Sequence, residues 1–304
     1  MVGGTLVKKW SYLCILTAGC LWGINGLFFR ALSAYGFDQM QVTFVKMVIA
    51  SLILFVGLLV KDPSLFKFRL KDCWIFLGAG LISMLFFNYC YYTSLVHTTV
   101  AVTVSLLYTG PGFVVLISAF LFKERITLRK LAALVIIFIG CACSAGLFSG
   151  SQTVTAAGIL WGLMAGLTYG LYTIFGRLAL NRGYETPTIT FYAIFVSAVG
   201  AIPFVDMGTI GTHMSLPSFG LCASVAVFSC LLPYVLFTTG MKKLEAGEAA
   251  MLATSEPVMA AVASAVILSE PLSGFVILGI VLIVGGIVLM NIKMKGNEAA
   301  GKES

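Results

Sequence analysis

Two ionisable residues, Lys46 and Glu256, lie within long stretches of the chain that are otherwise apolar. A charge in apolar surroundings is unfavourable unless it faces water or a partner, so such residues are candidates for a functional site. A lysine ammonium can bind a carboxylate, and a glutamate can bind an amine or take up and release a proton. We expect both side chains to bind a small ligand, and Glu256 also to carry a proton.

Each of these residues has a structural interpretation as well. Lys46 lies about seven residues into its apolar stretch, roughly 10 Å along a helix, so its stem could extend to lipid headgroups instead of a cavity. Glu256 precedes Pro257, which removes a backbone donor and loosens the helical turn. Its carboxylate could therefore accept hydrogen bonds from freed backbone amides. The sequence leaves both alternatives open.

Pro111 lies in a second flexible sequence, Tyr108-Thr-Gly-Pro-Gly112. Two glycines beside a proline weaken a helix at that point. Interrupted helices at corresponding positions of two halves indicate a transporter binding site. We therefore predict helix breaks at Pro111 and Pro257, close to the ligand.

Polar and aromatic residues in the other apolar stretches could line a cavity around these groups. Rings supply faces for the body of a ligand, and amides supply hydrogen bonds. Such residues also bond neighbouring helices together or lie at membrane interfaces. Besides Lys46 and Glu256, the predicted binding residues are Trp22, Asn25, Asn88, Tyr91, Tyr108, Tyr169, Tyr172 and Tyr234.

Motifs for other chemistry are weak or missing in the sequence. There is no phosphate-binding Gly-Lys-Ser/Thr loop, so we do not expect ATP to supply the energy. His97 and His213 lie far apart, and the aspartates lie at the ends of apolar stretches, which disfavours a catalytic triad or a metal site. A membrane-embedded transferase would need a nucleophile and base that we do not find. We expect no enzyme activity, no cofactor and no metal.

The composition shows which elements must position these side chains. Apolar residues make up 60% of the chain, charged residues 10%, and the mean hydropathy is +1.03, which is typical of an integral membrane protein. A helix that crosses the hydrocarbon needs roughly 20 apolar residues. We predict an all-α fold with ten transmembrane helices, near residues 11–31, 39–60, 73–95, 98–122, 130–148, 156–178, 188–206, 218–240, 247–268 and 273–292.

The chain also contains an internal duplication. Residues 19–44 recur as 166–191 at an offset of 147, and residues 87–140 recur as 233–286 at an offset of 146. The matched pairs include Gly19/Gly166, Gly23/Gly170, Thr43/Thr190, Pro111/Pro257 and Gly140/Gly286. We predict a first five-helix repeat over residues 1–148, a second over 149–295, and a disordered tail over 296–304. Because each repeat has an odd number of spans, the second would be inverted, with the substrate site between the two.

Basic residues predict the orientation. All nineteen lysines and arginines except Arg30 and Lys46 fall on one side of the predicted spans. Cytoplasmic connections retain positive charge during insertion, so we expect both termini to be cytoplasmic. The net charge of +7 is then an insertion signal, and we expect no nucleic-acid partner.

Glycines recur every four residues in the stretch 156–178, at Gly158, Gly162, Gly166 and Gly170. They leave one helix face without side chains, so a neighbouring backbone can approach closely. The face could serve for static packing or as a surface along which a gate helix slides.

Three motifs resemble the drug/metabolite transporter superfamily, and specifically its ten-helix EamA-type branch. They are Leu21-Trp22-Gly23, the sequence PGFVVLISAFLFKE from Pro111 to Glu124, and EPVMAAVASAVILSE from Glu256 to Glu270. The resemblance implies a multi-pass carrier of the bacterial inner membrane with a central cavity between two inverted halves. Members are often exporters of amino acids, nucleosides or drugs, and often have Arg at the position of Lys46.

From these features we expect a secondary-active exporter of small metabolites, such as amino acids or their derivatives, driven by proton exchange. Lys46 would bind a substrate carboxylate, and Glu256 a substrate amine or the coupled proton. The alternative is a multidrug exporter of lipophilic cations, in which Glu256 and aromatic faces bind the ligand. The expected partners are substrate, protons and membrane lipid, and the expected oligomeric state is a monomer.

Overall fold

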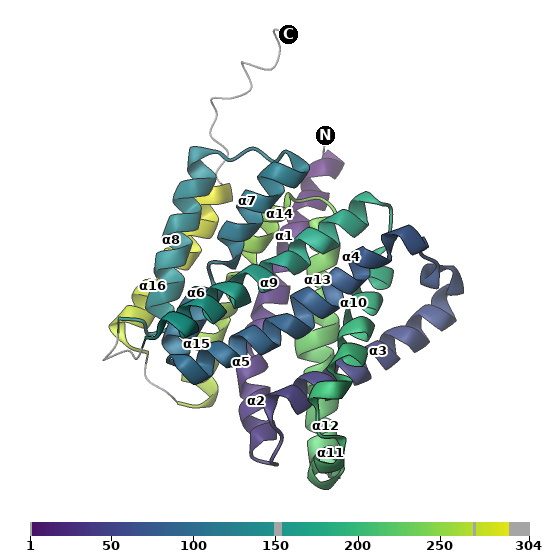
Figure 1. Cartoon of the computed structure of the whole chain (residues 1–304). Coiled ribbons are helices and arrows are strands. Elements are labelled where there is room, and N and C mark those ends of the chain that lie inside the picture. Colours follow the sequence, from purple (N-terminus) through teal and green to yellow (C-terminus); the bar gives the residue numbers. More distant parts are fainter. Residues whose placement is uncertain (1, 149–153, 270–271, 292–304) are drawn as a thin grey trace.

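A computed structural model describes residues 2–148, 154–269 and 272–291, and every regular element in these ranges is helical (Figure 1). The predicted tail at 296–304 lies outside these ranges. The first half of the chain contains α1 (Val2–Gly23), α2 (Asn25–Ser33), α3 (Gln39–Lys61), η1 (Pro63–Phe66), η2 (Leu70–Asp72), α4 (Cys73–Leu77), η3 (Gly78–Phe86), α5 (Phe87–His97), α6 (Val100–Leu107), α7 (Gly110–Phe122) and α8 (Leu128–Ser144). The second half contains α9 (Ala156–Asn181), α10 (Thr186–Ala201), η4 (Ile202–Phe204), α11 (Met207–His213), α12 (Leu216–Val225), η5 (Ala226–Leu231), α13 (Leu232–Met241), α14 (Ala246–Leu252), α15 (Ser255–Ile267) and α16 (Gly274–Asn291).

Eight helical segments of the described chain are long and apolar enough to cross a membrane. They are Lys8–Ser33, Gln39–Lys61, Leu70–His97, Val100–Phe122, Ala156–Asn181, Thr186–Phe204, Leu216–Met241 and Ala246–Ile267. The protein is thus an all-helical, multi-pass membrane protein. The two other predicted spans correspond to α8, which has 17 residues and includes Arg129 and Lys130, and to α16, whose apolar stretch is Gly274–Met290. The count of ten spans therefore stays a prediction.

Side-chain caps fix where several of these helices begin. Asp38 and Gln41 form a reciprocal capping box at the start of α3, and Ser215 and Ser218 form another at the start of α12. These side chains satisfy backbone N–H groups that have no partner within the helix. The caps explain why the predicted helix at 39–60 and the observed α3 begin at the same residue.

The helices α8 and α16 pack closely through residues that are related by the duplication. A Cβ atom on Gly140 of α8 would lie 2.9 Å from the backbone nitrogen of Ile283 in α16. A Cβ atom on Gly286 of α16 would lie 2.6 Å from Cγ1 of Ile137 in α8. Gly140 matches Gly286 and Ile137 matches Ile283 at the same offset of 146. In each helix, therefore, the glycine packs against the isoleucine of the other helix, so the duplication relates the two contacts to each other.

A second pair of contacts related by the duplication occurs where α1 meets α15 and where α9 meets α7. We call α7 and α15 the interrupted helices, because each follows a break in a longer helical segment. A Cβ atom on Gly23 of α1 would lie 2.5 Å from the carbonyl oxygen of Glu256, at the start of α15. A Cβ atom on Gly170 of α9 would lie 3.0 Å from the carbonyl oxygen of Gly110, at the start of α7. Only glycine permits these approaches. The first helix of each half thus packs against the interrupted helix of the other half.

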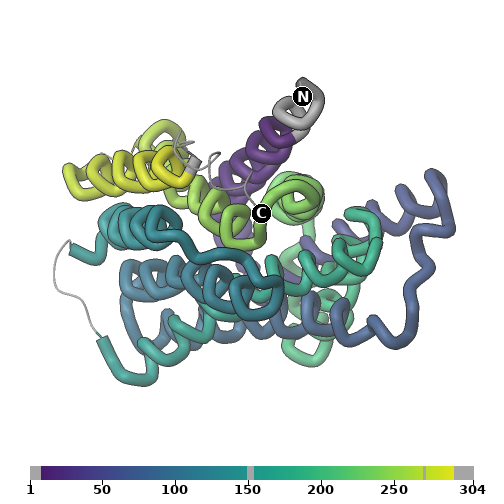
Figure 2. Tube along the Cα trace, turned by 90° about the horizontal axis from the view of Figure 1, so that it is seen from above, coloured from purple at the N-terminus to yellow at the C-terminus, as the bar shows by residue number. Residues whose placement is uncertain are grey.

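Two segments have π-helical geometry, and the sequence patterns did not predict them. These are η3, which runs into α5, and η5, which runs into α13. They lie at corresponding positions of the two halves. The π-helical turn is rare and is frequent at functional sites, because it rotates the side chains that follow it. Viewed from above, α8 and α16 lie at one side of the molecule, and the segment that joins α3 to α4 lies at the opposite edge (Figure 2).

Candidate functional site

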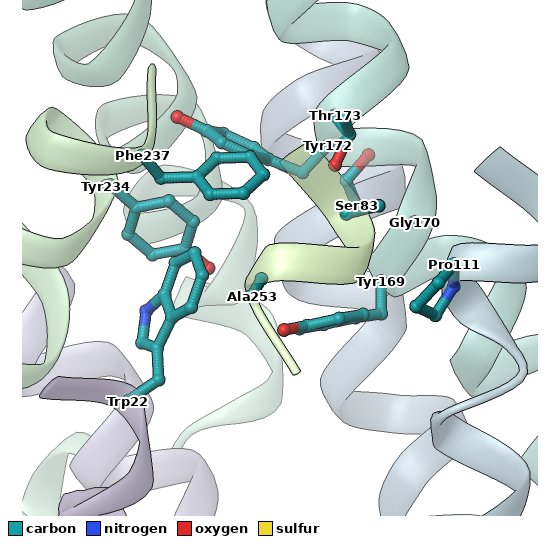
Figure 3. A pocket seen from close by; sticks show the side chains of 11 residues that line it. Trp22, Ser83, Pro111, Tyr169, Gly170, Tyr172, Thr173, Tyr234, Phe237 and Ala253 are labelled. Carbon is teal, nitrogen blue, oxygen red and sulfur yellow. The ribbon is translucent and has the colours of Figure 1, made fainter. Parts of the chain in front are cut away.

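A small pocket with a cavity volume of about 20 Å³ lies among α1, η3, α9, α13, α14 and the start of α7 (Figure 3). Aromatic side chains from three of these helices surround it, and small residues form the rest of its wall. The lining residues are Trp22, Ser83, Pro111, Tyr169, Gly170, Tyr172, Thr173, Tyr234, Phe237, Ala250 and Ala253. None of them is a lysine or arginine, so the wall is aromatic and weakly polar.

The rings contact each other edge to face or at a tilt. Trp22 of α1 lies 5.2 Å from the ring centroid of Tyr234 and 5.4 Å from that of Phe237, both in α13. Tyr172 of α9 lies 4.8 Å from Tyr234. Such arrangements leave ring faces and edges available to a ligand in fixed orientations. A cation placed over these faces would be attracted by the ring quadrupoles.

Glu256 reaches this pocket through Tyr169. The Tyr169 hydroxyl donates a hydrogen bond of 2.9 Å to Oε2 of Glu256, and Tyr169 lines the pocket (Figure 3). Within the described residues no backbone amide donates to this carboxylate. The carboxylate oxygens therefore keep acceptor capacity for a second donor.

Pro111 and Pro257 each lie in the first turn of a helix, α7 and α15. The missing N–H of proline costs little there, because the first amides of a helix have no intrahelical acceptor. The interruptions themselves lie just before the prolines, between α6 and α7 and between α14 and α15. Both predicted helix-break residues therefore adjoin a helix interruption, and Pro111 and Ala253 bring these interruptions to the pocket wall.

Lys46 lies in α3 and is partly exposed. In the described part of the chain its ammonium has no hydrogen bond or ion pair. It lies within electrostatic range of Cys230 in η5, a segment against which α3 packs. Lys46 is not among the residues that line the aromatic pocket.

Four other predicted residues lie outside the pocket wall. Asn88 donates to the carbonyl oxygen of Met84 at 2.6 Å and accepts from Thr43, so it joins α5 to α3. Asn25 is the partly exposed first residue of α2. Tyr91 contacts the Phe87 ring at 6.0 Å. Tyr108 is 5% exposed at the end of α6, where the helix is interrupted.

The structure also brings in residues that the sequence patterns did not single out. Phe237 lies three residues after Tyr234, a spacing that places both on one helix face and could have revealed it. Ser83 lies in the π-helical η3, where the regular spacing no longer tells which face a residue occupies. Thr238 bonds to the Tyr172 hydroxyl at 2.9 Å and fixes that ring from outside the pocket.

Hydrogen bonds also hold the connection between α13 and α14. The carboxylate of Glu124, just after α7, accepts from the backbone N–H of Ala246 at 2.7 Å and of Gly247 at 3.3 Å. Arg177 of α9 donates to the carbonyl oxygens of Met241 and Leu244. A carboxylate at a helix N-terminus and a guanidinium at a helix C-terminus both oppose the local dipole charge. Glu124 and Arg177, which belong to other parts of the chain, thus hold the two ends of the connection between α13 and α14.

Side chains of α1 and α8 add to this arrangement. Tyr12 donates to Glu248 of α14, and the Lys8 ammonium lies 3.6 Å from the same carboxylate. Lys130 of α8 pairs with Glu245. Residues of the first half therefore contact the start of α14, the helix that leads to Ala253 and Glu256.

Comparison with known proteins identifies relatives along most of the chain. Residues 9–146 and residues 156–292 each match the EamA-like transporter family. The uncharacterized transporter YxxF of Bacillus subtilis (strain 168) is 25% identical over 261 residues, which cover 84% of this chain and 82% of the relative. An uncharacterized transporter of Archaeoglobus fulgidus is 26% identical over 289 residues, which cover 92% of this chain and 96% of the relative.

The fold also matches a solved structure, titled only as the crystal structure of a protein. The TM-score is 0.77 at 18% sequence identity, and the match covers 92% of this chain and 96% of the other. At this identity the likeness concerns the fold alone.

Proposed function

Because this chain belongs to the EamA-like transporter family, we propose that it is a secondary-active exporter of small metabolites, such as amino acids or their derivatives. Proton exchange drives the transport, and the protein works by alternating access. The observation that carries this proposal is the aromatic pocket with Tyr169 and Glu256 on one side, formed where α1 of the first half meets α9, α13 and α14 of the second.

For the membrane topology we infer ten spans in two inverted five-helix repeats, over residues 1–148 and 149–295. The exchanged contacts of Gly140 with Ile283 and of Gly286 with Ile137 support this arrangement. So do the matches of the same family to both halves. Both termini lie in the cytoplasm of a bacterium, and the protein lies in the inner membrane.

The exchange mechanism follows from competition for one carboxylate. A substrate ammonium that reaches Glu256 needs the ionised form, whereas a proton on Glu256 removes that charge. Substrate and proton therefore bind alternately, which couples export of one to entry of the other. Tyr169 keeps its hydrogen bond in either case, since both forms of the carboxyl group have an acceptor oxygen.

Lys46 binds the substrate carboxylate in this scheme. Its unpaired ammonium supports the role, because a charge within a span requires a partner or water. The other predicted residues act around these two groups. Trp22, Tyr172 and Tyr234 enclose the body of the ligand, whereas Asn25, Asn88, Tyr91 and Tyr108 form the approach from α2, α5 and α6.

A second candidate is export of lipophilic organic cations. The specific observation in its favour is that aromatic rings line the pocket, a carboxylate adjoins it and no cation is present in its wall. Such a site suits an ammonium without a carboxylate.

Proteoliposomes with an enclosed pH indicator test both candidates. Amino acids, primary amines without a carboxylate and quaternary ammonium ions are added in turn, and proton movement is recorded. Proton movement with amino acids supports the first candidate, and movement with the amines or quaternary ions alone supports the second. Substrate transport without proton movement contradicts the coupling in both.

A further inference from the structure

Residues 61–71 join α3 to α4, and we call them the basic strap. The strap carries four exposed cations, Lys61, Lys67, Arg69 and Lys71. In the described chain none of the four forms an ion pair. Two carboxylates lie nearby. Asp62 is exposed, accepts from Ser64 and interacts electrostatically with Lys67, whereas Asp72 is buried against Arg182. Four cations and one exposed carboxylate leave the strap with a net positive charge.

The backbone of the strap is held in place by the second half of the chain. Thr188 donates to the carbonyl oxygen of Leu65 at 2.7 Å, and Tyr192 donates to that of Phe66 at 2.6 Å. The Arg69 N–H donates to the Tyr184 hydroxyl at 3.0 Å, and this hydroxyl donates to Asp72 at 2.7 Å. Burial and the bond to Asp72 raise the pKa of Tyr184, so its hydroxyl stays protonated. The strap is thus a fixed surface.

The side chains of the strap alternate. Lys67 and Arg69 have extended backbones, with φ and ψ of −75° and 126° and of −81° and 129°. Phe66 packs on Phe191 at 5.3 Å, and Phe68 packs on Tyr192 at 4.8 Å. Because successive side chains of an extended segment point to opposite sides, the inward rings direct Lys67 and Arg69 outward, about 6.6 Å apart along the chain.

The strap lies between two candidate membrane spans. It joins the span Gln39–Lys61 to the span Leu70–His97, and it lies at the outer edge of the molecule (Figure 2). Leu70 is 86% exposed and directly follows Arg69. An exposed leucine beside cations at the end of a membrane span can enter the acyl region while the cations stay among headgroups. The preference for basic residues in cytoplasmic connections during membrane insertion explains the positive charge of the strap. It does not explain why the cations alternate with aromatic rings that pack on the second half of the chain.

We propose that the basic strap binds the phosphate groups of anionic phospholipids in the adjacent leaflet, with Leu70 among their acyl chains. Basic clusters directly beside a transmembrane helix attract anionic lipids through each lysine and arginine. The proposal depends neither on the substrate nor on proton coupling, so it can fail or hold separately from the proposed function.

The test is lipid binding to the purified full chain, measured by native mass spectrometry with phosphatidylglycerol and, in parallel, phosphatidylcholine. A triple variant, Lys67→Gln, Arg69→Gln and Lys71→Gln, removes the outward charges. The control triple, Lys9→Gln, Arg125→Gln and Lys243→Gln, removes three exposed cations elsewhere. We expect the strap variant to bind phosphatidylglycerol roughly tenfold to a hundredfold more weakly, the control to bind like the parent, and phosphatidylcholine to be unaffected.

Unchanged phosphatidylglycerol binding in the strap variant would overturn the proposal, as would equal losses in both triples. Displacement of the lipid by millimolar inorganic phosphate would show a site for a soluble anion instead. A charge-preserving variant, Lys67→Arg with Lys71→Arg, should retain binding, which separates loss of charge from loss of fold.

Discussion

At the residue scale, the proposed site centres on one carboxylate with one described donor. Tyr169 holds Glu256 at the pocket, and Gly23 allows the backbone of Glu256 to lie directly against α1. In the proposed mechanism these contacts would keep the carboxylate in position while its proton or its ligand changes. Lys46 provides the opposite charge from α3, without a partner of its own in the described chain.

Neutralising Glu256 should separate coupling from binding. Glu256→Gln keeps the shape of the side chain and removes its titration. If Glu256 carries the proton, pH-driven uphill transport should stop, whereas exchange at equal substrate concentrations should survive and lose its pH dependence. Tracer flux in proteoliposomes checks both. A Gln variant that still concentrates substrate at the parent rate would exclude Glu256 as the coupling group.

Removing the charge of Lys46 should affect ligands according to whether they carry a carboxylate. Lys46→Met keeps the length of the side chain, and a lost charge-assisted hydrogen bond should weaken amino-acid binding by roughly tenfold to a hundredfold. Amines without a carboxylate should bind as before. Calorimetric titration with matched ligand pairs measures the difference, and equal affinity for both ligands in variant and parent would favour contact of Lys46 with lipid headgroups.

At the element scale, the interrupted helices depend on close approach by glycines and on polar contacts at their ends. Just after the breaks between α6 and α7 and between α14 and α15, Gly170 of α9 and Gly23 of α1 let a neighbouring helix approach the backbone closely. Glu124 covers the N–H groups at the start of α14.

Adding one methyl group at Gly23 should loosen this packing. Gly23→Ala would place its Cβ 2.5 Å from the carbonyl oxygen of Glu256, so α1 and α15 must separate. We expect a loss of about 1–3 kcal/mol in stability, seen as a lower melting temperature in detergent. Gly26→Ala is the matched control, because its Cβ would meet no atom within 4 Å. Equal melting temperatures for the two variants would contradict the close contact.

Removing the charge of Glu124 should destabilise the start of α14. Glu124→Gln retains one acceptor oxygen and loses the second charged acceptor, which should cost about 1 kcal/mol. Glu245→Gln is the control, since the Glu245 side chain is 49% exposed in its pair with Lys130 and such pairs contribute little. Thermal melting of both variants in one detergent measures the difference. A larger effect at Glu245 would contradict the assigned role of Glu124.

At the scale of the whole molecule, the two halves interlock instead of lying side by side as separate domains. Each half supplies the helix that packs on the interrupted helix of the other, and α8 packs against α16. In the proposed alternating access, the pocket would therefore open and close only when the halves move relative to each other. An inverted arrangement of this kind would let the same contacts form alternately at the two membrane surfaces.

The topology can be tested by chemical labelling. Single cysteines at Thr212 and at Arg125, both exposed, are introduced into a variant without other cysteines. A membrane-impermeant maleimide added to intact cells should label only the cysteine at 212, because the connection that contains Arg125 is basic and therefore cytoplasmic. Labelling of both sites from outside would contradict the proposed orientation and the ten spans.

The sequence alone was sufficient for the membrane class, the apolar helices, the paired prolines and the duplication, because hydropathy and spacing are local properties. Trp22, Tyr169, Tyr172 and Tyr234 could be singled out from the sequence because polar or aromatic groups are conspicuous within apolar helices, and all four line the pocket. Only the tertiary structure decided which of the candidates line the same pocket. Helices such as α10 and α16 are apolar all round, so their sequences do not reveal which face turns inward. That rotation is set by contacts between distant segments, such as Gly23 with Glu256, and by π-helical turns such as η3, which carries Ser83 of the pocket wall.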